Sequence, residues 1–99
     1  SEQLNSKEEQ WQKIKDEMIC AMKAGDRAKV DTLRYVLSQI NYAEIDKHEN
    51  LTDTEIIILL QKELKKRKEA RELYEKAQRQ DLVSQQDLEI KILETYLRV

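Results

Sequence analysis

The chain has 99 residues, with no proline, one glycine, one cysteine and a net charge of −2. This length suits one compact domain, since single domains run to roughly 100–200 residues. No run of about 18 apolar residues is present, and the first residues lack a basic segment followed by an apolar one, so neither membrane insertion nor export is expected. A single cysteine, Cys20, cannot build a disulfide framework. We therefore expect a protein of the cytoplasm or of an organelle matrix.

The composition favours helices, because Glu, Lys, Gln, Leu and Ala dominate it while the residues of tight hairpin turns are scarce. We predict an all-α fold: a small four-helix bundle with a long third helix and a C-terminal antiparallel helical hairpin. This helical domain is expected over residues 7–97, after a disordered N-terminal tail at residues 1–6. Residues 98–99 are also expected to be loosely ordered.

Two helices are predicted before residue 46, separated by a stop signal at Gly25 and an N-cap side chain at Asp26. The first covers about residues 7–24 and the second about residues 26–45. Each has apolar residues at helical spacing on one side. In the first helix these are Trp11, Ile14, Met18, Ala21 and Met22, and in the second Val30, Leu33, Val36, Leu37, Ile40 and Ala43.

A third helix should begin at Thr52-Asp53-Thr54-Glu55, because a Thr followed three residues later by Glu, just before an apolar run, forms a capping box. No stop signal follows until about residues 78–81, which gives a helix of about seven turns. Leu60 marks its core side, together with Ile57 and Leu64, while Ile58 points away. The chain is then expected to turn near Gln80 into a fourth helix, with its apolar stripe at Leu82, Ile90, Leu93, Tyr96 and Leu97.

Catalytic and metal sites need residue types that are nearly missing here. His48 is the only histidine and follows the second predicted helix in a polar loop, and Cys20 has no neighbouring cation to activate its thiol. One glycine cannot make a phosphate-cradling loop. We therefore expect no catalytic residues, no metal and no cofactor.

A basic segment lies within the third predicted helix and just after it. Residues 62–79 carry eight Lys or Arg and four Asp or Glu, whereas the rest of the chain carries ten and sixteen. A cluster of this kind can neutralise RNA phosphates. The alternative is a solvated helix face whose charges pair with each other: Glu63 with Arg67, Glu72 with Lys76 and Glu75 with Arg79. The candidate RNA contacts are Lys62, Lys65, Lys66, Lys68, Lys76 and Arg79.

Three further charges fall on the predicted core sides of the hairpin, and they are left out of this RNA-binding set. Arg67 and Arg71 lie on the side of Leu60, and Glu89 lies within the stripe of the fourth helix. A turn at Gln80 places Arg71 and Glu89 level with each other. We predict a shielded Arg71–Glu89 ion pair with Arg67 nearby, which fixes the register of the hairpin. Tyr35 and Tyr42 suit either base stacking or burial against another helix, so they are assigned no function.

Several short segments follow one another in a characteristic order within residues 11–97. They are Ala21-Met22-Lys23-Ala24-Gly25-Asp26, Leu33-Arg34, Glu44-Ile45-Asp46, Leu51-Thr52-Asp53-x-Glu55, Leu60-Gln61-Lys62-Glu63-x-Lys65-x-Arg67, Arg79-Gln80-Asp81-Leu82, Glu89-Ile90 and Ile92-Leu93-Glu94-x-Tyr96-Leu97. In this order they resemble the YqeY-like family. That family is similar to the C-terminal region of the B subunit (GatB) of the glutamyl-tRNA(Gln)/aspartyl-tRNA(Asn) amidotransferase, a carbon-nitrogen ligase that uses glutamine as amido donor.

The chain departs from the family pattern at four positions. Gln78 stands where the family usually has glycine, Gln86 where glutamate is frequent and Ala70 where serine is common. Arg98 stands where a proline usually follows Tyr96-Leu97. Family members continue past that proline into a second, smaller helical module. The chain therefore resembles the N-terminal helical half of such a protein.

The resemblance implies a non-catalytic module that binds tRNA or assists tRNA-dependent amidation. Its expected partners are tRNA, amidotransferase subunits or the missing C-terminal module, with neither DNA nor a membrane among them. The alternative is a protein-interaction module with no RNA role, for which the outward-pointing Ile58 is the expected contact.

Overall fold

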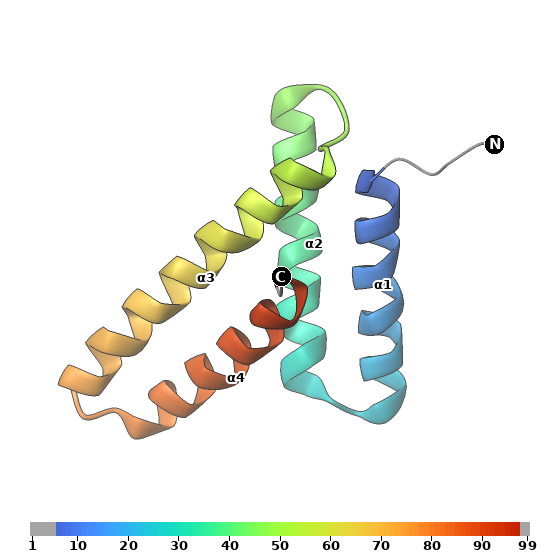
Figure 1. The fold of residues 1–99 in the computed structure, drawn as a ribbon. Helices are drawn as coiled ribbons and strands as arrows, with labels where there is room; N and C mark the ends of the chain where they lie inside the picture. The colour runs from blue at the N-terminus through green and yellow to red at the C-terminus, as the bar shows by residue number, and fades with distance from the viewer. Residues whose placement is uncertain (1–5, 98–99) are drawn as a thin grey trace. The chain divides into compact units, whose positions relative to one another are not determined.

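The computed structural model describes residues 6–97, with side chains from Gln10 onward. This part of the chain contains four helices and no strand: α1 (Ser6–Ala24), α2 (Arg27–Lys47), α3 (Asp53–Lys76) and α4 (Gln80–Tyr96) (Figure 1). The prediction of an all-α chain with four helices is confirmed. Ser6 already belongs to α1, while the rest of the expected N-terminal tail and residues 98–99 lie outside the described residues.

The chain divides into two compact units, Ser1–Ile58 and Leu59–Val99. Unit 1 contains α1, α2 and the first residues of α3. Unit 2 contains the remainder of α3 and all of α4. The expectation of one domain over residues 7–97 stays a prediction.

In unit 1, α1 and α2 run antiparallel and pack against each other (Figure 1). The predicted apolar stripes supply the buried side chains, as their spacing requires. One expectation is wrong, because Met22 is 52% exposed at the end of α1. Its side chain lines a surface hollow at the turn that follows α1. The buried members are Ile14 and Ala21 on α1, and Val30, Leu33, Val36 and Ile40 on α2.

The turn between α1 and α2 follows the predicted stop and start signals. Gly25 has a φ of +75°, the left-handed conformation that glycine adopts without steric cost. The N–H of Gly25 donates to the Met22 carbonyl at 3.2 Å, and that of Asp26 donates to the Ala21 carbonyl at 2.9 Å, the pattern of a Schellman motif. The Asp26 carboxylate then accepts from the Lys29 N–H at 3.2 Å and caps α2.

The predicted capping box is present at the start of α3. The Thr52 N–H donates to Glu55 Oε1 at 2.8 Å, and the Glu55 N–H donates to Thr52 Oγ1 at 3.2 Å. Lys47 at the end of α2 donates to both carboxylate oxygens of Glu55, at 2.7 and 2.8 Å. One glutamate therefore ties together the two helix ends that the loop connects.

The loop itself is held by a second glutamate and by a left-handed residue. His48 ends α2 with a φ of 64°. The N–H of Leu51 donates to Glu44 Oε2 at 3.0 Å, and the Leu51 side chain is 6% exposed. The five residues between α2 and α3 are thus anchored both by hydrogen bonds and by burial.

In unit 2 a second Schellman motif ends α3. Gln78 has a φ of 59°, its N–H donates to the Glu75 carbonyl at 3.0 Å, and the Arg79 N–H donates to the Tyr74 carbonyl at 2.9 Å. The helix therefore ends at Lys76, and α4 begins four residues later at Gln80. The turn is centred near Gln78, two residues before its predicted place.

The buried side of unit 2 is partly polar. Leu60 and Glu63 of α3 are 1% and 4% exposed, and Gln86 of α4 is 6% exposed. The stripe predicted for α4 is correct only at Leu93, because α4 turns a neighbouring face inward. The other buried apolar residue of α4 is Val83, while Leu82, Ile90, Tyr96 and Leu97 are half-buried.

Replacing Gln78 by glycine is expected to stabilise the protein. A left-handed φ costs a residue with a side chain about 1–2 kcal/mol relative to glycine, and part of this gain is lost to the greater freedom of glycine in the unfolded chain. We expect Gln78→Gly to raise the free energy of unfolding by about 0.5–1 kcal/mol, measured by urea denaturation. Gln61→Gly, the same change at an exposed position inside α3, should lower it by a similar amount. A loss in both variants would contradict this account of the turn.

Stability should depend on pH through Glu55. The hydrogen bond from Lys47, and next that from the Thr52 N–H, lower the pKa of the Glu55 carboxyl below its ordinary 4.5. The unfolded chain therefore binds this proton more readily, so the contribution of Glu55 is complete above pH 4.5 and is lost as the pH falls through the lower folded pKa. We expect Glu55→Gln to be less stable than the parent at pH 7, with a difference that narrows in acid. The matched control is Glu69→Gln, which removes an exposed carboxyl. Its difference in thermal unfolding from the parent should not narrow in acid.

Candidate nucleic-acid interface

Three lysines form an exposed basic face on α3 in unit 2. Lys62, Lys65 and Lys76 point to the side opposite the buried Leu60, since successive residues advance by 100° around a helix. No acidic group among the described residues lies within ion-pair distance of any of them. They span about 21 Å of the helix axis at 1.5 Å per residue. We call this set the outer lysines.

The other three candidate contacts are each paired with an acidic residue. Lys66 lies 3.6 Å from Glu63, Lys68 lies 3.6 Å from Glu94, and Arg79 lies 3.1 Å from Asp81. These cations are 56–66% exposed, and exposed pairs of this kind are worth at most about 1 kcal/mol. A phosphate can therefore compete for them, at some cost in affinity.

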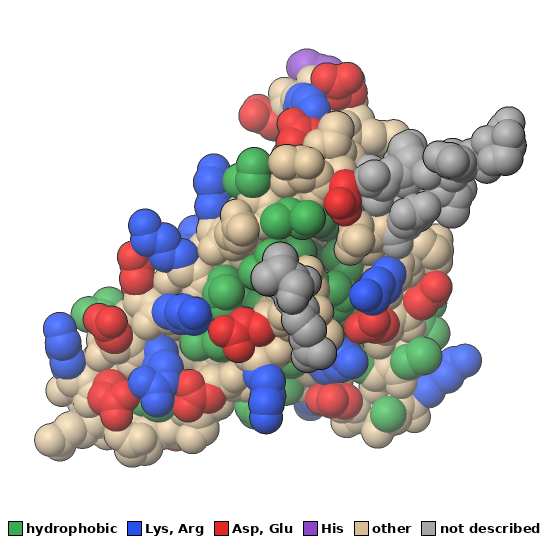
Figure 2. Space-filling model, in the orientation of Figure 1, with side chains coloured by type: hydrophobic (Ala, Val, Ile, Leu, Met, Phe, Trp, Pro, Cys, Tyr) green, Lys and Arg blue, Asp and Glu red, His purple; other side chains and the backbone are tan. Residues whose placement is uncertain are grey.

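Arg79 stands apart from the other candidates because it lies in the turn after α3. Its hydrogen bond to Asp81 raises the pKa of the guanidinium and lowers the pKa of the Asp81 carboxyl. Asp81 lies in the first turn of α4, where a negative charge is favourable. On the face drawn in Figure 2, basic and acidic side chains are intermixed.

The self-pairing alternative is correct for one of its three pairs. Glu63 Oε1 lies 3.8 Å from Arg67 Nη2. The expected pairs Glu72–Lys76 and Glu75–Arg79 are absent from the described side chains. Arg79 lies beyond the end of α3, so the four-residue spacing no longer brings it beside Glu75. Glu75 pairs instead with Arg71, at 2.8 Å.

The ion pair that joins α3 to α4 differs from the predicted one. Glu89 pairs with Arg67, at 3.4 Å between Oε1 and Nε, and not with Arg71. Arg71 donates to Asp87, which raises the pKa of its guanidinium. The predicted Arg71–Glu89 pair is wrong because it assumed a turn at Gln80. With the turn near Gln78, Glu89 faces the residue one helical turn earlier on α3.

Arg67 lies between two shielded carboxylates. The side chains of Glu63 and Glu89 are 6% and 17% exposed, and that of Arg67 is 28% exposed. Glu63 Oε1 is buried and accepts no hydrogen bond. Removing the guanidinium would leave Glu89 without its ion-pair partner on α3 and Glu63 with Lys66 alone, which is costly at a shielded position. These contacts favour the structural role expected for Arg67, which stays a prediction.

Several other candidate features lie outside this face. Tyr35 and Tyr42 on α2 are 37% and 65% exposed, and Ile58 is 45% exposed, as its predicted direction implies. Among the residues described, no group of His, Cys, Asp and Glu is placed to hold a metal ion. Within the same part of the chain, no helix has the length and apolar character needed to cross a bilayer.

Comparison with known proteins identifies the family. A sequence model of the YqeY-like proteins matches residues 11–98. The chain is 33% identical over 84 residues to "Uncharacterized protein C22F3.15" of Schizosaccharomyces pombe, covering 85% of this chain and 68% of that protein. It is 37% identical over 84 residues to "Altered inheritance of mitochondria protein 41, mitochondrial" of Kluyveromyces lactis, covering 84% of this chain and 45% of that protein. The chain thus spans less than half of the Kluyveromyces lactis protein.

The register of the α3–α4 pair can be tested by a double-mutant cycle. We expect Arg67→Ala and Glu89→Ala to be coupled by about 0.5–2 kcal/mol in the free energy of unfolding, because their side chains share a partly shielded contact. Arg67→Ala combined with Glu72→Ala is the matched control, since Glu72 lies on the exposed side of α3. That combination should be additive within about 0.5 kcal/mol. Additivity of both combinations would show that Arg67 does not pair with Glu89.

Proposed function

The chain belongs to the YqeY-like family, and from this membership we propose that it is a non-catalytic helical module that binds tRNA or assists tRNA-dependent amidation. The family resemblance supports the choice of tRNA, through the likeness of the family to the B subunit of the amidotransferase. The contact surface is the basic side of α3, which carries Lys62, Lys65, Lys66, Lys68 and Lys76 and continues to Arg79.

The observation that carries this proposal is the state of the outer lysines. α4 supplies the acidic partners of Arg67, Lys68 and Arg71. Lys62, Lys65 and Lys76 point away from these acids and keep their charge uncompensated. An unpaired lysine can neutralise a phosphate and release a counterion without first breaking an ion pair. The outer lysines therefore supply the core of the proposed contact.

The balance of charge implies weak binding by this chain alone. Its net charge is −2, so distant parts of the protein repel a polyanion while the outer lysines attract it. Affinity should thus fall steeply with salt, and additional contacts from a partner or from a further module would be needed for tight binding. The proposed site of action is the cytoplasm or an organelle matrix. The Kluyveromyces lactis relative is named as a mitochondrial protein, which supports the organelle matrix as the site of action.

The chemistry of amidation is proposed to lie outside this chain. In the amidotransferase that the family resembles, another subunit releases ammonia, and a different domain of the B subunit activates the tRNA-bound amino acid. Among the described residues, no group of His, Cys, Asp and Glu is placed to hold a metal ion. The role proposed for this module is to hold the tRNA or to contact amidotransferase subunits.

The salt dependence of tRNA binding tests the proposal. We expect the parent chain to bind unfractionated tRNA at low salt, with affinity falling linearly on a log–log plot. Lys62→Gln with Lys65→Gln should reduce the slope of that plot by about 1.4–1.8, since each phosphate contact contributes about 0.7–0.9. The matched control is Lys23→Gln with Lys91→Gln, two exposed lysines outside the outer face.

Equal slopes for the two double variants would remove the outer lysines from the contact. Absence of binding at low salt, or binding that is insensitive to salt, would contradict an RNA role altogether. The alternative role in protein interaction would then stand, with the 45% exposed Ile58 as its expected contact.

A further inference from the structure

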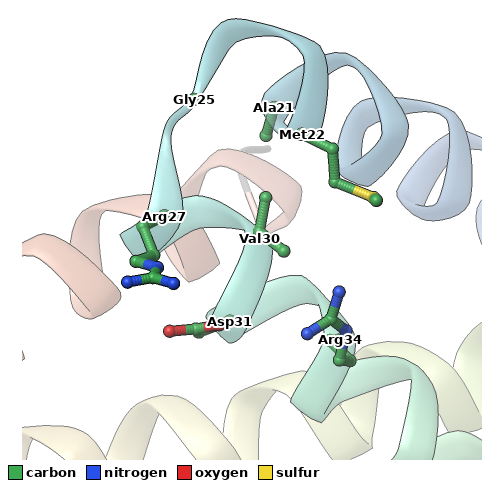
Figure 3. A pocket seen from close by; sticks show the side chains of 7 residues that line it. All are labelled: Ala21, Met22, Gly25, Arg27, Val30, Asp31 and Arg34. Atoms are coloured by element: carbon green, nitrogen blue, oxygen red, sulfur yellow. The ribbon is translucent and has the colours of Figure 1, made fainter.

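A hollow of about 300 Å³ lies at the turn between α1 and α2, wholly within unit 1 (Figure 3). Its apolar lining comes from Ala21 and Met22 at the end of α1 and from Val30 in the first turns of α2. Gly25 borders it, and a Cβ built on Gly25 would meet no atom within 4 Å.

Met22 is the side chain that gives this hollow the character of a binding surface. It is 52% exposed, although Ala21 and Val30 beside it are 5% and 8% exposed. Methionine is flexible and polarisable, and it is used at surfaces that adapt to a partner. An exposed methionine over a small apolar floor can close around one inserted apolar side chain.

Two arginines on α2 border the same hollow. Arg27 and Arg34 are exposed, and neither has an ion-pair partner among the residues that the structure describes. Asp31 lies between them along the helix and is also exposed and unpaired within that part of the chain. Asp31 is four residues from Arg27 and three from Arg34, spacings at which residues of one helix can pair. Neither pair is formed among the described residues, so both guanidinium groups remain available to an anionic partner.

The separation of the arginines argues against one small anion as the ligand. They are seven residues apart, which places their Cα atoms about 10.5 Å apart along the axis of α2. A second helix repeats this spacing, because residues i and i+7 lie on the same face at the same rise. Residues i+3 and i+4 of that helix lie between them on this face, level with the apolar floor.

We propose that this hollow is the docking site for an acidic amphipathic helix of a partner protein, with two carboxylates seven residues apart and an apolar side chain between them. The carboxylates pair with Arg27 and Arg34, and the apolar side chain enters the hollow against Met22, Ala21 and Val30. Arginine clusters that read acidic motifs and grooves that receive an amphipathic helix are both established modes of peptide recognition.

A protein partner fits this site better than RNA does. The Asp31 carboxylate between the two arginines would repel a phosphate backbone, whereas a protein can place a basic or hydrogen-bonding side chain opposite it. The apolar floor gives a phosphate nothing to contact. The site lies in unit 1, whereas the outer lysines belong to unit 2.

The test uses a labelled synthetic helix of about 20 residues, alanine-rich so that it is helical in water, with the pattern Glu-x-x-Leu-Leu-x-x-Glu. Binding to the full chain is measured by fluorescence anisotropy. We expect Arg27→Gln with Arg34→Gln to weaken binding about tenfold or more, since charge-assisted hydrogen bonds are lost. Met22→Gln should weaken it to a similar degree by placing an uncharged polar group at the apolar floor. All three positions are exposed, and thermal unfolding would verify that each variant folds.

Two controls and a competition with tRNA separate the possible outcomes. Lys23→Gln with Lys91→Gln removes the same charge elsewhere and should change the affinity less than twofold. A peptide with both leucines replaced by alanine should bind about tenfold more weakly. No binding of the original peptide at about 1 mM, or equal losses for the two double variants, would overturn the proposal. The surface would be assigned to RNA instead if two results came together. Binding would be weakened by the arginine substitutions but not by changes at Met22 or the leucines, and tRNA would displace the peptide.

Discussion

Each of the described helices α1, α2 and α3 is followed by a single residue in the left-handed conformation, on which the turn to the next helix depends. Gly25, His48 and Gln78 have φ values of 75°, 64° and 59° and end α1, α2 and α3. The sequence has no proline and one glycine, so two of the three turns impose this conformation on residues with side chains, which costs about 1–2 kcal/mol each. Neighbouring contacts must offset that cost. After α2 these are the bonds of Glu44 and Glu55, and after α3 they are the ion pairs of the hairpin.

The turn at Gln78 also decides which charges of α3 are available. Because it sets the register of the hairpin, it places Glu89, Asp87 and Glu94 of α4 beside Arg67, Arg71 and Lys68 of α3. These pairs use the cations on the inner side of α3 and leave the outer lysines unpaired. One helix thus has a structural side and a candidate binding side, and the boundary between them follows from where the helix ends.

The sequence was sufficient to predict features that depend on local chemistry. The capping box at Thr52 and Glu55, the stop at Gly25 and the cap at Asp26 each need only the side chains at fixed spacing, and all three are present. The turn at Gln78 could not be found this way, because glutamine carries no preference for a left-handed φ. Burial of Glu63 and Gln86 was missed for a related reason, since a polar residue gives no signal for a core position. The candidate site shows the same division: the basic cluster is visible in the sequence, but the pairing of its members is not.

Overall charge says little about what this protein recognises. With 38% charged residues and a net charge of −2, most cations have an anion within a few residues, and a long-range field large enough to select a partner is not expected. Recognition then has to come from places where pairing fails. The outer lysines in unit 2 and the two arginines beside the hollow in unit 1 are such places, and they differ in what surrounds the charge. The lysines lie on a helix surface, which suits a phosphate backbone, whereas the arginines border an apolar floor and an acid, which suits a protein helix.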